Sequence, residues 1–158
     1  MTLERKFKIF YSIIILLCLS SIFYAFFVEY FLGYKPCILC KYQRVPYMLG
    51  LIIGLFGFFE PSNTKIIIYI FLIFLISLIL SGYHFGIEQE LYHSIFACSD
   101  DNLNVLEKGK LLKSLKVINP DCRNVNFAVF GVSLATINLI LSFVICSISY
   151  YLYSYAKN

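Results

Sequence analysis

Long apolar runs, separated by short polar segments, dominate the pattern along this chain. Residues 9–28 and 66–87 carry no charged side chain, and a third uncharged run extends over residues 124–156. About 20 apolar residues, each adding about 1.5 Å of helix, cross the hydrocarbon core of a bilayer. Each of these three runs is therefore predicted to contain a membrane-spanning helix.

A fourth span is less obvious, because the apolar run over residues 45–59 has only 15 residues, below the usual minimum of about 17. The run becomes long enough if its helix begins near Cys40. Lys41 and Arg44 would then lie in the first turns, where basic side chains can extend into the headgroups. Pro46 is tolerated there because first-turn amides have no helical partner to lose.

The pattern predicts an all-α membrane protein, a single domain over residues 1–158 built as a four-transmembrane-helix bundle. The predicted spans are residues 8–29, 40–59, 66–87 and 132–153, and the outer loops are residues 30–39 and 88–131. Leucines and lysines recur at near-helical spacing between residues 103 and 118. They predict a short amphipathic helix lying on the bilayer in the second outer loop; a solvated helix packed on its own loop is the alternative.

The composition agrees with a chain surrounded by membrane lipid. Apolar residues make up 60% of the chain and charged residues 14%, proportions that lie outside those of soluble domains. The net charge is +4, and the basic residues lie between the spans, so no nucleic-acid partner is predicted. The basic N-terminus imitates a signal peptide, but the following apolar run is too long and lacks a small-x-small cleavage site. A retained first helix is predicted.

Cysteines carry the candidate chemistry. Cys37 and Cys40 form a CxxC motif between two apolar runs, and Cys98 and Cys122 lie in the second outer loop. A redox-active dithiol is favoured for the motif, although a palmitoylated thiol or two small residues without a role are alternatives. A zinc site would need a second CxxC or a histidine pair at similar spacing, and the two histidines of the chain are nine positions apart. No metal site is predicted.

The topology brings the two cysteine pairs to one membrane face. Four spans place both termini on one side, so the two outer loops share the other side. Basic residues do not decide which side is cytoplasmic, since the terminal face carries five and the loop face eight. Disulfides persist outside the cytosol, which favours cytoplasmic termini. Two dithiols within reach exchange disulfides by thiolate attack, whereas Cys18 and Cys146 lie within spans and are interpreted as buried apolar residues.

Polar residues near the CxxC motif suggest how it reacts. A helix N-terminus and a cationic Arg44 one turn further on both favour a thiolate at Cys40. Arg44 could also donate a hydrogen bond to a carbonyl oxygen of a membrane-soluble electron acceptor, or anchor the helix among headgroups. His84 is either an interfacial histidine or a ligand contact. Asn138, within the last span, is predicted to face another helix rather than lipid.

These motifs together resemble the disulfide bond formation protein B family, DsbB, the quinone-dependent membrane thiol oxidases of bacteria. The resemblance rests on KPCILCKYQR in the first outer connection, on GYHFGIEQE at the end of the third span, and on the later Cys98 and Cys122. It covers essentially the whole chain, in order. The CxxC motif followed by tyrosine, glutamine and arginine is its specific part.

The resemblance implies a relay in the bacterial inner membrane, with active cysteines in the periplasm. A soluble DsbA-like thiol oxidase would be reoxidised at the Cys98/Cys122 disulfide, with the mixed disulfide at Cys98, and Cys122 would then attack Cys37. Cys40 would pass the electrons to ubiquinone or menaquinone beside Arg44. The resemblance also places His84 and Glu88 near the quinone.

Three other functions compete with this hypothesis. The vitamin K epoxide reductase type also combines a helical bundle, a quinone and cysteine pairs, but there the CxxC motif follows the loop cysteines. A structural four-helix membrane protein with a stapling loop disulfide would gain about 3 to 4 kcal/mol from the bridge, yet it leaves the CxxC motif unexplained. A metal transporter is disfavoured because no span carries carboxylates or a histidine cluster along a path.

Overall fold

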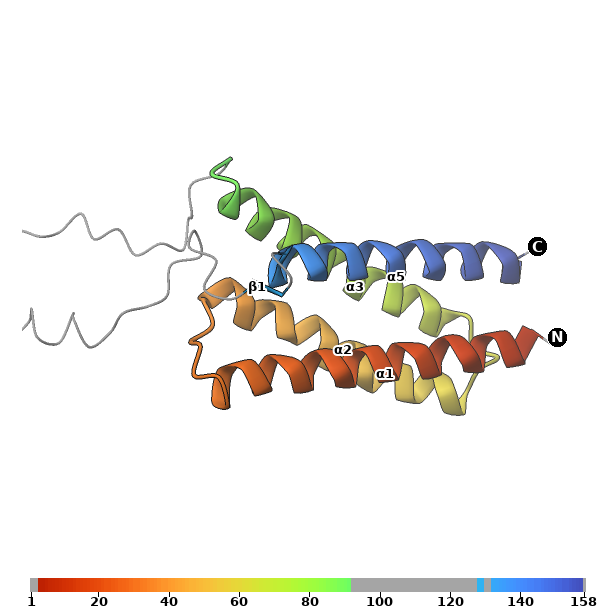
Figure 1. The fold of residues 1–158 in the computed structure, drawn as a ribbon. Coiled ribbons are helices and arrows are strands. Elements are labelled where there is room, and N and C mark those ends of the chain that lie inside the picture. Colours follow the sequence, from red (N-terminus) through yellow and green to blue (C-terminus); the bar gives the residue numbers. More distant parts are fainter. Residues whose placement is uncertain (1–2, 92–127, 130–131, 158) are drawn as a thin grey trace, which may run out of the picture.

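The structure, a computed structural model, describes residues 3–91, 128–129 and 132–157. Four long helices account for most of these residues, and two very short strands precede the last helix (Figure 1). The helices are α1 (Leu3–Tyr30), α2 (Ile38–Phe59), α3 (Lys65–Glu88) and α5 (Leu134–Lys157). The strands β1 (Ala128–Val129) and β2 (Val132–Ser133) pair antiparallel, with Ala128 opposite Ser133.

The helices form an antiparallel bundle in which α1 packs on α2, α2 on α3, and α3 on α5. Figure 1 shows both chain termini at one end of the bundle. The α1–α2 connection, the end of α3 and the β1–β2 pair lie at the opposite end. The connection that carries the CxxC motif and the beginning of the last helix therefore share one end, as the predicted topology requires.

Small residues let α1 approach α2 closely. Gly50, Gly54 and Gly57 of α2 are buried, and they face the α1 residues Tyr11, Ile14, Ile15 and Cys18 and the α3 residue Phe74. A Cβ atom on Gly57 would lie 2.5 Å from the ring of Tyr11, a separation that packed carbon atoms do not reach. On this side of the bundle, aromatic and aliphatic side chains of α1 and α3 pack against glycines of α2, and α5 completes the core with Ile145, Cys146 and Leu152.

The outer surface of the bundle is strongly apolar, with many large side chains exposed along every helix. Within the described residues, three helices are long and apolar enough to cross a membrane: α1, α3 and α5. The prediction of an all-α membrane protein is therefore confirmed. Helix α2 has 22 residues, but its first turns hold Lys41, Gln43 and Arg44, so the count of four spans stays a prediction.

The helices do not begin at the same residues as the predicted spans. Helix α1 begins at Leu3, ahead of the span predicted from residue 8, α2 begins at Ile38, two residues before Cys40, and α5 begins at Leu134, two residues after residue 132. In α5 the physical reason is Ser133, whose Oγ accepts a hydrogen bond from the Thr136 amide at 3.2 Å and so caps the helix. The spans themselves stay predictions. The predicted amphipathic helix of the second outer loop lies outside the described residues.

Candidate dithiol site and cavity

The two cysteines of the motif form the first turn of α2. Cys37 is the N-cap residue, and its Sγ accepts a hydrogen bond from the Cys40 amide at 3.4 Å. The thiol of Cys37 in turn donates to Cys40 Sγ at 3.0 Å. Unpaired amides and the partial positive charge at a helix N-terminus favour negative charge on both sulfurs. Because the helix begins two residues earlier than predicted, Cys37 as well as Cys40 receives this electrostatic support.

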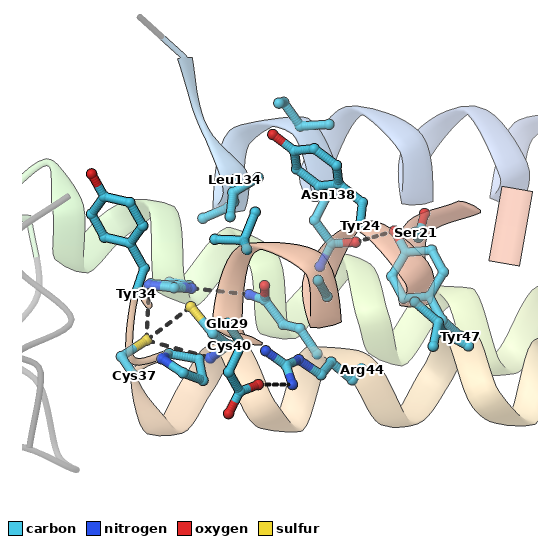
Figure 2. A pocket seen from close by; sticks show the side chains of 18 of the residues that line it. Ser21, Tyr24, Glu29, Tyr34, Cys37, Cys40, Arg44, Tyr47, Leu134 and Asn138 are labelled. Atoms are coloured by element: carbon cyan, nitrogen blue, oxygen red, sulfur yellow. Dashed lines mark hydrogen bonds and ion pairs between the residues drawn. The ribbon is translucent and has the colours of Figure 1, made fainter. Parts of the chain in front are cut away.

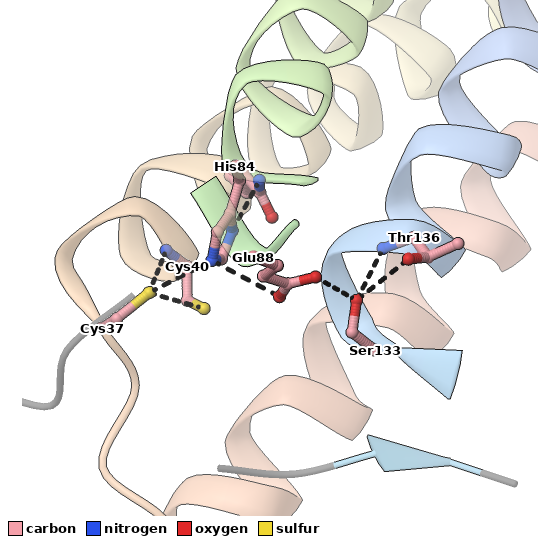
Figure 3. A network of polar contacts seen from close by, with 7 residues as sticks. Cys37, Cys40, His84, Glu88, Ser133 and Thr136 are labelled. Carbon is pink, nitrogen blue, oxygen red and sulfur yellow. Dashed lines mark hydrogen bonds and ion pairs between the residues drawn. The ribbon is translucent and has the colours of Figure 1, made fainter. Parts of the chain in front are cut away.

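A buried histidine of α3 contacts the more deeply buried of these sulfurs (Figure 3). His84 is 3% exposed, and its Nε2 lies 3.7 Å from Cys37 Sγ. Its Nδ1 lies 3.2 Å from the amide nitrogen of Gln43. An amide nitrogen can only donate, so Nδ1 accepts and the proton of the neutral ring is assigned to Nε2. Two acceptors lie 3.7 Å from this nitrogen, Cys37 Sγ and a carboxylate oxygen of Glu88. His84 is thus placed to stabilise a Cys37 thiolate.

Glu88 extends the network from α3 to α5. One carboxylate oxygen lies 3.7 Å from His84 Nε2, and the other accepts a hydrogen bond from Ser133 Oγ at 2.5 Å. Because Ser133 also caps α5, the same hydroxyl fixes the helix start and the carboxylate. The family resemblance predicted that His84 and Glu88 lie near the quinone. In the structure both belong to the network that reaches Cys37.

Arg44 forms an ion pair with the α1 residue Glu29, with Nη1 and Oε2 2.5 Å apart. The side chains are 16% and 24% exposed, and the guanidinium also lies over the Phe26 ring, 5.2 Å from its centroid. Arg44 is thus held between α1 and α2. This position is more consistent with a contact inside the bundle than with an anchor among headgroups.

A cavity of about 190 Å³ connects these groups (Figure 2). An apolar cavity of about 150 Å³ accommodates a benzene molecule, so this one has room for a substituted six-membered ring. All four long helices contribute to its wall, which is mainly apolar. Its lining residues with polar or sulfur atoms near the dithiol are Glu29, Tyr34, Lys35, Cys37, Cys40, Gln43, Arg44, His84 and Glu88, and deeper in the bundle Ser21, Tyr24, Tyr47 and Asn138.

Five of the seven predicted site residues therefore meet at one cavity. They are Cys37, Cys40, Arg44, His84 and Glu88. The other two, Cys98 and Cys122, lie outside the described residues. Cys18 is fully buried and Cys146 is 6% exposed, as predicted.

Sequence reasoning missed four residues of the site: Glu29, Gln43, Tyr47 and Ser133. Glu29 gave the clearest available signal, because an acidic side chain at the end of an apolar run needs a partner. Gln43 was included in the KPCILCKYQR motif, but no role at the site was predicted for it. Asn138 was predicted to face another helix, and this is confirmed: it is 8% exposed and accepts a hydrogen bond from Tyr47 of α2.

The dithiol and His84 also have the composition of a partial metal site. Among the described residues, one ligand atom from each of Cys37, Cys40 and His84 lies within 4.8 Å of the others. Zinc accepts such ligands but takes four in structural sites. The described residues thus supply three of the four ligands of a structural zinc site, and the same proximity serves a dithiol whose thiolate is stabilised by an imidazole.

The fold and the site define a helical membrane protein with a dithiol on the wall of an apolar cavity. Comparison with known proteins specifies the class further. The family model described as "Disulfide bond formation protein DsbB" matches residues 7–152, and the chain belongs to this DsbB family. It is therefore a thiol oxidoreductase of a family that forms disulfide bonds.

Individual relatives are distant. A disulfide bond formation protein B of Xylella fastidiosa is 27% identical over 128 residues, which cover 75% of this chain and 73% of the relative. Another, from Psychrobacter cryohalolentis, is 24% identical over 149 residues, covering 89% and 84% respectively. An uncharacterized protein of Rickettsia prowazekii is 26% identical over 145 residues, covering 88% and 83%. The similarity thus extends over most of each protein.

Proposed function

We propose that this protein is a membrane thiol:quinone oxidoreductase that reoxidises a soluble DsbA-like thiol oxidase. One observation carries the proposal. The Cys37/Cys40 dithiol and the cation Arg44 lie on the wall of a single apolar cavity inside a helical bundle. A cavity of this kind suits a flat, membrane-soluble electron acceptor.

The residues present fit ubiquinone or menaquinone. The wall combines apolar side chains for the ring with Arg44 as a donor for a carbonyl oxygen, and the cavity size suits a six-membered ring. When bound, a quinone accepts two electrons and two protons and leaves as the quinol. A strong terminal acceptor is needed because oxidases of the DsbA type have a potential of about −120 mV.

The thiols carry the electrons to this cavity in balanced exchanges. The reduced partner gives up a dithiol and takes over the Cys98/Cys122 disulfide through a mixed disulfide at Cys98. Cys122 then attacks Sγ of Cys37 in the Cys37/Cys40 disulfide, and Cys40 leaves as a thiolate. Attack by Cys98 on Cys122 restores the outer disulfide and leaves Cys37 and Cys40 as a dithiol, which holds the two electrons beside the cavity.

The groups around the dithiol control its charge. His84 Nε2 lies 3.7 Å from Cys37 Sγ, and its proton can stabilise negative charge on that sulfur during the exchange. Glu88 lies at the same distance from Nε2 and is itself held by Ser133. The N-terminus of α2 favours negative charge on both sulfurs, and the Cys37 thiol donates to Cys40 Sγ at 3.0 Å. His84 adds a contact at Cys37 alone, as expected if Cys37 exchanges with thiols while Cys40 faces the acceptor.

The proposal includes a location. Helix α2 crosses the membrane as well, which brings the number of spans to four. Both termini are cytoplasmic, and the dithiol lies at the periplasmic face of a bacterial inner membrane. The support is the shared end of the two termini in Figure 1 and the persistence of disulfides outside the cytosol.

Turnover by purified protein tests the proposal. The protein in detergent is mixed with a reduced thioredoxin-fold oxidase and a soluble quinone, and quinone reduction is followed by absorbance. Wild type should turn over, and Cys40→Ser and Cys98→Ser should each reduce the rate to background. Cys146→Ala is the matched control, because this buried cysteine lies outside the cavity lining, and it should retain wild-type turnover.

An inert wild type, with every quinone and partner tried, would contradict the proposal if its cysteines remain stably paired. The outer disulfide would then act as a structural staple.

A further inference from the structure

Within the part of the chain that the structure describes, two buried side-chain polar atoms lack a hydrogen-bond partner: Tyr11 Oη and Asn138 Nδ2. Tyr11 packs against Gly57 in the α1–α2 contact and does not line the cavity. Asn138 does line it. A buried amide nitrogen that lacks a partner is costly, which makes Asn138 the polar group of the bundle that most needs a partner from outside the protein.

The orientation of this amide is fixed by its neighbours. Asn138 Oδ1 accepts a hydrogen bond from the Tyr47 hydroxyl, and Ser142 Oγ lies 3.3 Å from the same oxygen. Reversing the amide would leave the Tyr47 proton without this acceptor. The oxygen therefore faces Tyr47 and Ser142, and both protons of Nδ2 are left for the cavity side.

Asn138 and Arg44 approach the cavity from different helices (Figure 2). Asn138 belongs to α5 and Arg44 to α2, and both line the same space. A quinone has two carbonyl oxygens on opposite sides of its ring, and each can accept a hydrogen bond. Two hydrogen-bond donors on separate walls match these two carbonyl oxygens, whereas a ligand with a single acceptor oxygen would leave one donor unused.

We propose that Asn138 Nδ2 donates a hydrogen bond to the second carbonyl oxygen of the bound quinone, and that Asn138 thereby helps to select and orient it. This inference rests on the proposed function. Tyr47 and Ser142 act as positioning residues, because they hold the amide without supplying the donor. The ligand recognised in this way is an apolar ring with two opposed acceptor oxygens.

Binding without turnover tests this assignment. Oxidised full-length protein in detergent, with no reductant, is equilibrated with a radiolabelled short-chain ubiquinone, and the dissociation constant is measured by equilibrium dialysis. Asn138→Leu, which keeps the approximate volume but removes the donor, should raise this constant about three- to tenfold, the loss expected for one neutral hydrogen bond. Ser149→Ala is the matched control: Ser149 is a buried polar residue of the same helix, its hydroxyl donates to the Ile145 carbonyl of that helix, and it does not line the cavity. This variant should change the constant less than twofold.

A spectroscopic readout of the wild type does not depend on how a variant folds. Infrared difference spectra of wild type with quinone labelled with ¹³C at one carbonyl or the other report each carbonyl separately. Both carbonyl bands should move to lower frequency than in an apolar solvent, and Asn138→Leu should return one of them while leaving the other in place.

The outcomes separate the two claims. If wild type binds the quinone but Asn138→Leu binds equally well, or if only one carbonyl band is displaced in wild type, the role of Asn138 is refuted and the proposed function stands. If wild type binds no quinone, the proposed function itself fails. A raised dissociation constant together with one restored carbonyl band supports the assignment.

Discussion

Replacing Ser133 by alanine should weaken the protein at the junction between α5 and the dithiol site. The Ser133 hydroxyl makes two contacts that matter: it accepts from the Thr136 amide at 3.2 Å and donates to Glu88 Oε2 at 2.5 Å. The substitution removes both contacts without changing the backbone. It therefore leaves one amide at the start of α5 uncapped and the Glu88 carboxylate with one bond fewer.

The expected magnitude follows from these two bonds. Loss of an N-cap costs about 1 kcal/mol, and loss of a hydrogen bond to a charged group costs about 1.5 to 3 kcal/mol. Hydrogen bonds within membrane proteins are weaker on average, about 0.6 kcal/mol with a maximum near 1.7. Ser133→Ala should accordingly lower the free energy of unfolding by about 2 kcal/mol, and Ser133→Thr, which keeps the hydroxyl, should change it by less than about 0.5 kcal/mol.

Reversible unfolding by sodium dodecyl sulfate in mixed micelles, followed by circular dichroism, measures this difference. Ser147→Ala is a suitable control, since Ser147 is exposed on the same helix and bonds only to the Phe143 carbonyl of its own helix. A loss below about 0.5 kcal/mol for Ser133→Ala, or a loss equal to that of Ser147→Ala, would refute the reasoning. A variant with threonine as unstable as the one with alanine would refute it as well.

Three further predictions concern the cavity, the core and the remaining cysteines. Arg44→Ala should raise the quinone KM about 10- to 100-fold, as expected for a lost hydrogen bond from a charged donor, and an unchanged KM in steady-state kinetics would exclude this contact. Gly57→Ala should lower the free energy of unfolding by about 1 to 3 kcal/mol in the same micelle titration, because its Cβ would overlap the Tyr11 ring; a neutral result would mean that α1 can shift freely. A double variant with Cys18→Ala and Cys146→Ala should keep its turnover with quinone, and its inactivity would show that the buried thiols take part in the relay.

The sequence was sufficient for the membrane class and for most of the site. The helices α1, α3 and α5 follow from uncharged apolar runs, since a bilayer demands such lengths whatever the tertiary contacts are. The CxxC motif and Arg44 were found because their spacing is local, within two turns of one helix. Local spacing, however, placed the start of α2 two residues too late, because Cys37 rather than a later residue caps the helix.

The contacts between helices could not be predicted in the same way. Glu29 meets Arg44, and Tyr47 meets Asn138, only because of how each helix is rotated about its axis. Apolar residues cover nearly the whole circumference of these helices, so the pattern gives little information on which face is inside. The same limit applied to Ser133, whose double role depends on where α3 ends beside α5.

The central claim is that the Cys37/Cys40 dithiol itself reduces a quinone held in the cavity. A chain that carries Cys98→Ala and Cys122→Ala retains this pair alone on the proposed periplasmic face and permits a single turnover. The reduced protein is mixed with one equivalent of ubiquinone without oxygen, quinol is measured by absorbance, and the remaining thiols are alkylated and counted by mass spectrometry. One quinol per protein, with Cys37 and Cys40 joined in a disulfide, is the predicted result. Quinone that stays oxidised while both thiols remain open to alkylation would contradict the account.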